Sequence, residues 1–330
     1  MKQHDPQLVD PHGRRFPYLR LSLTDVCNFS CDYCLPDGYQ CSEKKQFLTL
    51  NEITNAVAAF ADLGTYKIRL TGGEPTLRKD FVEIISMIKS TPGIEQIAVT
   101  TNGYRLEENI ESWVEAGLTH LNVSVDTLDA KLFNSLTGHN RLKKILAGID
   151  KALKLPLAKV KLNAVLLKGI NSHQILEYTG LIRNKALSVR FIELMQTGDN
   201  LEYFKRYHVS SQALKNELFS NGWTEKLKDI ASGPAQEYVH PDYKGSFGII
   251  APYSKSFCDS CNRLRLSSVG SFHLCLFGEK GYSVRHLLQS ASQLDILKEQ
   301  LIVALADKPK AHFLHQQNTG MTPNLSTIGG

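Results

Sequence analysis

The sequence predicts an α/β protein: an incomplete barrel of six strand–helix units, followed by a C-terminal region that carries cysteines. Short apolar or alternating runs recur between amphipathic helical runs over roughly 200 residues, which is typical of parallel strands joined by right-handed helical crossovers. Several of the helical runs end at a glycine or before a proline, as helices usually do. Because eight such units would close a barrel, six predict one that stays open along its side.

The first unit shows how each element is assigned. Leucines alternate with polar residues over 18–24, which is the period of a strand. Thr49 and Glu52 then form a capping box ahead of an apolar stripe, and Gly64 ends this helix of residues 51–63. The same reasoning predicts strands at residues 67–71, 96–101, 120–125, 159–166 and 188–194. It predicts helices at residues 80–88, 107–116, 142–153, 174–184 and 211–219.

Composition and charge exclude several classes of protein. Of 330 residues, 42% are hydrophobic and 22% charged, which describes a globular chain rather than a disordered one. The longest apolar run, near residues 56–61, is far shorter than the roughly 20 residues that cross a bilayer, and the N-terminus lacks the apolar segment of a secretory signal. We therefore expect a cytoplasmic protein. The formal net charge of +5 suits an anionic small molecule at least as well as nucleic acid.

Seven cysteines in a chain without an export signal favour metal binding or reactive thiols over a disulfide framework. Cys27, Cys31 and Cys34 form a C-x3-C-x2-C run directly after the first strand. Three thiolates on one short loop can hold a [4Fe-4S] cluster and leave one iron open to a ligand. The alternatives are a zinc site that borrows Cys41 and three thiols buried in the core.

A second set of three cysteines lies far downstream, at Cys258, Cys261 and Cys275. Its spacing alone supports a second open cluster about as well as a structural zinc site completed by His273 or His286. Two three-cysteine sets in one chain favour two clusters. We therefore place a domain boundary near residue 225: residues 1–225 would form the barrel with the first cluster, and residues 226–330 would carry the second.

Distinctive residues follow the strands at the points where the strands end. Such residues occur at 71–75 (T-G-G-E-P), 100–103, 124–126 and 193–195. Because the carboxyl ends of parallel barrel strands form one face, we expect these residues to meet at one site. Gly72 and Gly73 lack side chains, so a backbone there could approach a ligand closely. A lone G-G-E-P would more often be a turn.

Positive charges lie within the predicted strands, at Arg20, Lys67, Arg69, Lys161 and Arg190. Lys67, Arg69 and Thr71 alternate with apolar residues, so they face one way, into the barrel. Together with Arg263 and Arg265 beside the second cysteine set, these cations predict a cavity that binds an anion. A triphosphate is a suitable ligand for several arginine and lysine side chains. About half of such charges could instead point outward and only solubilise the surface.

The cysteine run after the first strand and the G-G-E-P after the second resemble the radical S-adenosylmethionine superfamily. The second cysteine set, the overlapping N-R-L-R at residues 262–265 and the terminal Gly329 and Gly330 narrow this resemblance. Together they resemble the GTP 3',8-cyclase family (the MoaA family) of molybdenum cofactor biosynthesis, from about residue 16 to residue 330. The resemblance implies a radical S-adenosylmethionine barrel, two [4Fe-4S] clusters and S-adenosylmethionine as cofactors.

The resemblance also implies a role for each matching residue. The ligands of the first cluster would be Cys27, Cys31 and Cys34, and those of the second Cys258, Cys261 and Cys275. The positions that line the S-adenosylmethionine pocket are Tyr33, Gly73, Ser124 and Met195. The positions that contact GTP are Arg20, Arg69, Thr100, Lys161, Arg263 and Arg265. In the implied reaction a 5'-deoxyadenosyl radical takes the ribose 3' hydrogen of GTP, and the sugar radical attacks C8 of guanine.

The product implied is (8S)-3',8-cyclo-7,8-dihydroguanosine 5'-triphosphate. The implied partners are GTP, S-adenosylmethionine, an electron-donor protein and, downstream, cyclic pyranopterin monophosphate synthase. The protein could form a homodimer, and no membrane or nucleic acid is implied as a partner.

One alternative function is that of a peptide-modifying radical S-adenosylmethionine enzyme, which would carry more C-terminal cysteines and lack the two terminal glycines. The other is a zinc-stabilised nucleic-acid-binding module, which would need a basic stripe or basic and aromatic residues interleaved.

Overall fold

The computed structural model describes residues 8–40, 45–175, 177–227, 233–326 and 328. Cys41, Gly329 and Gly330, which the sequence analysis names, lie outside these residues. Within them, no helix combines the length and the apolar composition that a membrane crossing needs.

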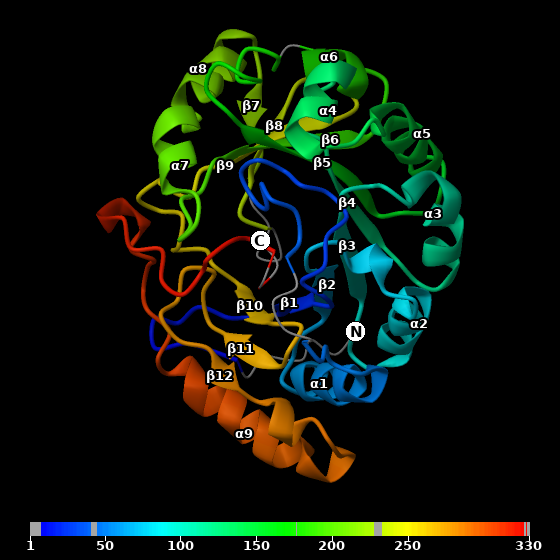
Figure 1. Ribbon diagram of the computed structural model, residues 1–330, viewed down its shortest axis with the longest axis vertical. Helices are drawn as coiled ribbons and strands as arrows, with labels where there is room; N and C mark the ends of the chain where they lie inside the picture. The colour runs from blue at the N-terminus through cyan, green and yellow to red at the C-terminus, as the bar shows by residue number, and fades with distance from the viewer. Residues whose placement is uncertain (1–7, 41–44, 176, 228–232, 327, 329–330) are drawn as a thin grey trace.

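Parallel strands form the curved centre of the molecule (Figure 1). In spatial order they are β10 (Arg263–Leu266), β1 (Tyr18–Ser22), β2 (Lys67–Thr71), β3 (Gln96–Thr101), β4 (His120–Ser124), β5 (Lys159–Leu166), β6 (Leu187–Glu193) and β9 (Ser246–Ile250). Antiparallel strands extend one end with β11 (Ser271–His273) and β12 (Tyr282–Ser283), and the other with β8 (Gln236–Val239) and β7 (Thr224–Glu225). In the described chain β12 and β7 stand at opposite ends of this order, so the barrel is open.

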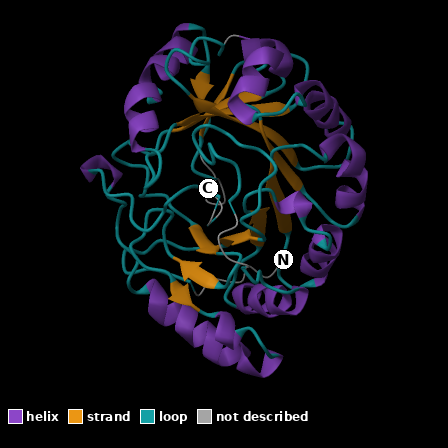
Figure 2. Ribbon diagram, in the orientation of Figure 1, coloured by secondary structure: helices purple, strands orange, loops and turns teal. Residues whose placement is uncertain are grey.

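Helices surround the strands on the outside (Figure 2). They are α1 (Leu50–Asp62), α2 (Phe81–Ser90), α3 (Leu106–Glu115), α4 (Ala130–Thr137), α5 (Leu142–Ala152), α6 (Glu177–Ile182), α7 (Leu201–Tyr207), α8 (Gln212–Ser220) and α9 (Leu294–Leu305). Short 3-10 turns occur at η1 (Pro75–Leu77), η2 (Arg285–Leu287), η3 (Ala291–Gln293) and η4 (Leu314–Gln316). The late helix α9 packs against the early helix α1, so an early and a late segment of the chain meet on the outside.

The alternation along the strands separates the core from the interior of the barrel. On β1 and β2, Leu19, Leu21, Ile68 and Leu70 are fully buried in the hydrophobic core. The residues between them have side chains of the opposite kind, arginine and lysine, and these line a cavity. Because successive strand residues point to opposite faces, the apolar face packs on the helices and the polar face looks into the barrel.

The capping box predicted for α1 is present. The Thr49 side chain accepts a hydrogen bond from the Glu52 backbone N–H, and the Glu52 side chain accepts one from the Thr49 N–H. The same Glu52 carboxylate accepts a hydrogen bond from Arg285 at 2.8 Å. The cap therefore also ties α1 to the C-terminal region.

The predicted fold class, an incomplete parallel α/β barrel, is confirmed, and the strand bounds of β2, β3 and β5 are those predicted. The elements of the described chain that were not expected include α4, α7, α9 and the strands β7 to β12. Strands β9 and β10 add a parallel strand at each side of the predicted six. They are short, and neither is followed by a long amphipathic helix, so they do not repeat the strand–helix pattern that predicts the others.

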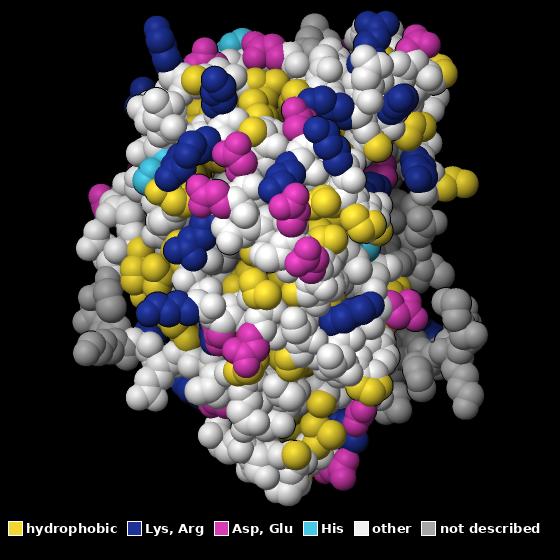
Figure 3. Space-filling model, turned by 90° about the vertical axis from the view of Figure 1, so that its right-hand side faces the viewer, with side chains coloured by type: hydrophobic (Ala, Val, Ile, Leu, Met, Phe, Trp, Pro, Cys, Tyr) yellow, Lys and Arg dark blue, Asp and Glu magenta, His cyan; other side chains and the backbone are white. Residues whose placement is uncertain are grey.

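Acidic and basic side chains are interspersed on the outer face that Figure 3 shows, with hydrophobic side chains scattered between them. The side of the molecule in this view carries α2, α3 and α5 (Figure 1). The mixed charge of this helical layer contrasts with the interior of the barrel, where cations gather.

Candidate active site

The first three cysteines lie on the loop that follows β1. Cys27, Cys31 and Cys34 are all half-buried and line one cavity, which we call the first cavity. The Cys34 amide donates to the Cys31 carbonyl at 2.9 Å, so these two stand on one tight turn. Burial raises the pKa of Cys27 to about 11 and that of Cys34 to about 12. Thiolates here therefore need a bound cation, and an iron cluster fits that need.

Gly72 and Gly73 are required by the backbone of this same loop. The Gly73 N–H donates to the Thr24 carbonyl at 2.8 Å. A Cβ on Gly73 would lie 2.4 Å from the Val26 carbonyl oxygen, and one on Gly72 would lie 2.2 Å from that of Thr24. Gly72 also has φ of +145°, where a side chain is strained. The protein's own loop therefore requires these glycines, and because both also line the first cavity, the approach of a ligand to them stays a prediction.

A hairpin assembles the second cysteine set. Cys258 and Cys261 follow β9, and the antiparallel pair β10–β11 returns the chain to Cys275. All three are half-buried and line a second cavity. Burial by itself raises the pKa of Cys261, but Arg263 and Lys308 outweigh it and lower that pKa to about 7. At Cys261 the thiolate form, which binds iron, is thus favoured by neighbouring cations, whereas burial raises the pKa of Cys258.

Neither set is arranged around a single ion. Within the described ranges, no three histidine, cysteine, aspartate or glutamate side chains converge on the position of one metal ion. In a [4Fe-4S] cube each cysteine binds a different iron, so its ligands stand apart around a cage. The soft thiolate donors of both sets suit that cage.

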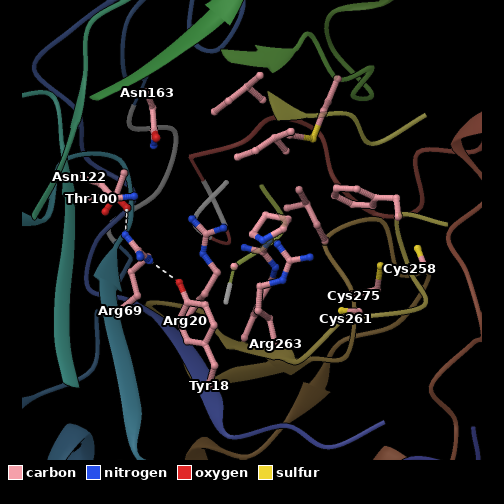
Figure 4. A pocket seen from close by; sticks show the side chains of 18 of the residues that line it. Tyr18, Arg20, Arg69, Thr100, Asn122, Asn163, Cys258, Cys261, Arg263 and Cys275 are labelled. Atoms are coloured by element: carbon pink, nitrogen blue, oxygen red, sulfur yellow. Dashed lines mark hydrogen bonds between the residues drawn. The ribbon is translucent and has the colours of Figure 1, made fainter. Parts of the chain in front are cut away.

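Cations from five strands line the second cavity: Arg20, Lys67, Arg69, Lys161, Arg190, Arg263 and Arg265. Three of them, Arg20, Arg69 and Arg263, are labelled in Figure 4. The strand register explains their meeting, because Arg20 of β1 stands level with Arg69 of β2 and with Arg265 of β10. The second cysteine set lies at one side of these side chains. Sequence reasoning about alternation on β2 therefore placed the cations on the correct face.

The cations of the second cavity are destabilised by burial and by one another. Burial, followed by the charges of Arg190, Arg69 and Lys67, lowers the pKa of Lys161 to about 5. Burial and Arg263 lower the pKa of Arg265 to about 10. A polyanion that enters the cavity would stabilise the charged forms of these side chains, which are unfavourable without it.

Buried polar atoms without partners mark the same cavity as a place for a polar ligand. In the described part of the chain, Asn122 Oδ1, Asn163 Oδ1, Arg190 Nε and His312 Nε2 have no hydrogen-bond partner. All four residues line the second cavity. Because an unpaired buried polar atom costs about 1–3 kcal/mol, a ligand with several donors and acceptors would be stabilised here.

The two cavities are contiguous. Both are lined by Thr100, Asn163, Ile192 and Met195, which form their shared wall. The first cavity contains the predicted cofactor-pocket residues Tyr33, Gly73, Ser124 and Met195. The second contains the predicted GTP contacts Arg20, Arg69, Thr100, Lys161, Arg263 and Arg265. The structure thus gathers every predicted site residue into two adjoining cavities, each lined by one cysteine set.

Asp126 is a cavity residue that sequence reasoning did not select, although it ends a strand-end segment that was noted. Its carboxylate accepts hydrogen bonds from the Tyr33 hydroxyl and from the Val165 amide, both at 2.8 Å. Burial raises its pKa to about 6. Asp126 therefore fixes the orientation of the Tyr33 side chain in the first cavity.

Two further cavity residues that the sequence analysis missed lie at alternate positions of a strand, as the cations do. Asn122 stands two residues before Ser124, and Asn163 two residues after Lys161, and both line the second cavity. The C-terminal tail also takes part: Leu325 and Ser326 line the first cavity. The Ile328 carbonyl accepts a hydrogen bond from Arg265 Nη1 at 3.2 Å. No periodic pattern points to the position of the tail.

Comparison with known proteins agrees with this geometry. Residues 21–182 match the family model of the radical SAM superfamily, and residues 187–314 match the model named Molybdenum Cofactor Synthesis C. A GTP 3',8-cyclase of Vibrio atlanticus (strain LGP32) is 53% identical over 326 residues, which is 98% of each chain.

Solved structures share the fold at low identity. Streptococcus suis SuiB has a TM-score of 0.56 at 13% identity, with 90% of this chain and 68% of that chain covered. SuiB bound to S-adenosylmethionine has a TM-score of 0.54, also at 13% identity, with 95% and 75% covered. These likenesses concern the fold alone, whereas the identity to the Vibrio protein extends along the whole chain. The chain belongs to the GTP 3',8-cyclase family of the radical S-adenosylmethionine superfamily.

Proposed function

We propose that this protein is a GTP 3',8-cyclase, which converts GTP to (8S)-3',8-cyclo-7,8-dihydroguanosine 5'-triphosphate in an early step of molybdenum cofactor biosynthesis. The observation that carries the proposal is the pair of adjoining cavities, each lined by one three-cysteine set, with seven cations lining the second cavity. A triphosphate matches the cations, and a purine edge matches the unpaired amides and the open iron of a second cluster.

Two [4Fe-4S] clusters fit the two cysteine sets, because each set offers three thiols on short loops. Cys27, Cys31 and Cys34 would hold the cluster next to S-adenosylmethionine. The second would be held by Cys258, Cys261 and Cys275. When bound, the clusters and S-adenosylmethionine supply one-electron reduction and a radical that abstracts hydrogen. The protein's residues bind and orient the substrate.

In this proposal the strand cations hold the triphosphate. Arg20, Arg69 and Arg265 stand level on neighbouring strands, so their guanidinium groups can share the phosphate oxygens. Lys161 is protonated as the triphosphate enters, because a nearby polyanion favours its charged form. Buried walls exclude bulk water, which would otherwise screen the charges that hold the triphosphate.

At the other end of the space, Tyr33, Gly73, Ser124 and Met195 would enclose S-adenosylmethionine. Met195 and Thr100 line both cavities, so they lie where cofactor and substrate would meet. Holding both molecules against one shared wall brings the ribose within reach of the cofactor's radical, which is catalysis by proximity.

The proposal extends to the protein's surroundings. Residues 1–225 would act as the radical-generating unit and residues 226–330 as the unit that anchors guanine. The reaction needs an electron-donor protein, and its product would pass to cyclic pyranopterin monophosphate synthase. We further propose a cytoplasmic protein that can form a homodimer.

Anaerobic incubation of the cluster-loaded protein with GTP, S-adenosylmethionine and a strong reductant tests the function. We expect mass spectrometry to detect the cyclised triphosphate together with 5'-deoxyadenosine. With GTP deuterated at the ribose 3' position, the deuterium should appear in 5'-deoxyadenosine. Formation of 5'-deoxyadenosine without a cyclised product or deuterium transfer would overturn GTP as the substrate and favour a peptide-modifying enzyme.

A further inference from the structure

Tyr18 places a phenol among the cations of the second cavity. It lies on β1, two residues before Arg20, and its side chain lines the cavity with only 4% of the residue exposed. Its oxygen accepts a hydrogen bond from Arg69 Nε, and Arg69 Nη1 donates to Thr100 Oγ1 at 3.1 Å (Figure 4). The Lys67 ammonium lies 5.2 Å from the centroid of the Tyr18 ring. Tyr18 therefore holds the orientation of one cation and packs against another.

The charged groups that face this phenol come from every neighbouring strand. They are Arg20 on β1, Lys67 and Arg69 on β2, Arg263 and Arg265 on β10, and Arg190 on β6. A carboxylate on the β6 side, that of Glu237, already binds Arg190 and Lys159, each at 2.7 Å. The groups that act most strongly on the phenol are thus cations, which stabilise its ionised form.

Burial opposes ionisation of Tyr18, but Arg69, Arg20 and Lys67 together outweigh it and lower its pKa to about 7. A phenolate in the cavity is then accessible near neutral pH. That phenolate offsets part of the repulsion among the arginines before any anion is bound.

A triphosphate changes this balance. It offers the arginines a stronger anion, and it repels the phenolate at short range. Resting on the proposed function, we propose that Tyr18 is a positioning residue that orients Arg69 for the triphosphate of GTP and takes up one proton as GTP binds. The proton comes from solvent and joins the phenolate oxygen to give the neutral phenol, which accepts the Arg69 hydrogen bond as before; no electron is transferred.

The test compares the wild-type protein with Tyr18→Phe, which keeps the ring and removes the oxygen. GTP is titrated calorimetrically into anaerobic, cluster-loaded protein without S-adenosylmethionine, in two buffers that differ in ionisation enthalpy. The difference in heat gives the number of protons taken up. Lys161 and the GTP phosphates also take up protons, but they do so in both proteins, so the difference reports on Tyr18 and on Lys67, whose pKa Tyr18 raises.

At pH 8 the wild type should take up about 0.9 proton more than Tyr18→Phe, as a phenol with a pKa of about 7 requires, and at pH 5.5 the difference should vanish. The order of the two proteins in GTP affinity should reverse as the pH rises. At pH 6, Tyr18→Phe should bind GTP about two- to tenfold more weakly, because Arg69 has lost its hydrogen bond. Above pH 7 the wild type should lose affinity relative to the variant by up to roughly tenfold per pH unit, since binding then requires protonation.

Tyr104→Phe is the matched control. The Tyr104 hydroxyl accepts a hydrogen bond from Arg141 at 2.9 Å, and the Arg141 guanidinium lies 4.2 Å from the ring centroid, so this pair resembles Tyr18–Arg69 outside both cavities. It should behave as the wild type does. Equal proton uptake by Tyr18→Phe and wild type, with GTP bound by both, would overturn the role of Tyr18 alone. Failure of the wild type to bind GTP at any pH would overturn the proposed function itself.

Discussion

Arg20 on β1 and Arg265 on β10 occupy the same register position on adjacent parallel strands, and both line the second cavity. Burial, and then the charge of Arg265, lowers the pKa of Arg20 well below its usual value. Like charges held side by side destabilise the empty cavity and become favourable once an anion lies between them. The site is thus organised for its ligand at a cost to the free protein.

Arg265→Lys should weaken GTP binding about ten- to a hundredfold although it preserves the formal charge. Lysine cannot reproduce the planar set of donors, and a lost charge-assisted hydrogen bond costs about 1.5–3 kcal/mol. Burial already lowers the pKa of Arg265 to about 10, so a lysine here would lose part of its charge. Anaerobic calorimetry with GTP measures the effect, with Arg206→Lys on the exposed face of α7 as the control. Equal affinity of Arg265→Lys and wild type would remove Arg265 from the substrate site.

Lys161→Met should stabilise the protein while weakening GTP binding. The folded pKa of Lys161 is about 5 against an ordinary 10.5, so between these values the unfolded chain binds a proton that the folded chain does not. Lys161 therefore costs stability, fully below pH 5 and progressively less as pH rises to 10.5.

The measurement for Lys161→Met is the thermal unfolding midpoint of the cluster-loaded protein between pH 7 and 10. The midpoint of the variant should exceed that of the wild type at pH 7, and the gap should narrow towards pH 10. Lys185→Met, which removes an exposed partner of Asp150, should change the midpoint little. A variant less stable than wild type at pH 7 would contradict this reading of Lys161.

The two cysteine sets should lose iron independently. Two four-iron clusters require about eight irons per chain, so replacing Cys27, Cys31 and Cys34 together by alanine should leave about four and abolish cleavage of S-adenosylmethionine. Iron analysis and the quantity of 5'-deoxyadenosine measure this. Full iron content in the triple variant would mean that the first set holds no cluster.

Replacing Cys258, Cys261 and Cys275 should also halve the iron, but with another consequence. Slow cleavage of S-adenosylmethionine should persist without cyclisation, because guanine would lose its anchor. Cys41→Ala, which removes the cysteine outside both sets, serves as the control and should keep all the iron. Cyclisation that survives loss of the second set would show that this set is structural.

Gly73→Ala should displace the first cysteine loop. A Cβ would lie 2.4 Å from the Val26 carbonyl oxygen and 2.5 Å from that of Asp25, so the backbone that leads to Cys27 must shift. We expect loss of S-adenosylmethionine cleavage and of up to half the iron, with the second cluster retained. Gly180→Ala is the matched control, because nothing lies within 4 Å of its added Cβ and alanine favours a helix. Unchanged cleavage in Gly73→Ala would show that the loop tolerates the shift.

The sequence predicts local features of this molecule better than distant ones. The sequence predicted the bounds of strands β2, β3 and β5 and the Thr49–Glu52 cap correctly. Strand alternation and helix capping depend only on residues that are close together in the sequence. Strand β10 was missed because it is recognised as a strand only when it pairs with β1, far away in the chain.

In the candidate site, too, features that depend on neighbouring residues were predicted and those that depend on distant residues were not. The alternation along β2 correctly predicted that Lys67 and Arg69 point into the barrel. The same alternation along β4 and β5 would also have identified Asn122 and Asn163. The contact between Ile328 and Arg265 follows from the path of the C-terminal tail, which depends on packing of the whole domain. No local pattern encodes such a path.

The pairing of β1 with β10 has a consequence for how the chain is made. Residue 18 leaves the ribosome early, and its partner Arg263 is synthesised roughly 245 residues later, about 12 to 50 s at ordinary rates of translation. During that interval one edge of β1 has no native partner, and an open strand edge invites pairing with other chains. Long-range parallel pairing of this kind also folds slowly. Production of this protein should therefore depend on chaperones that shield the nascent β1 edge until the last parallel strand arrives.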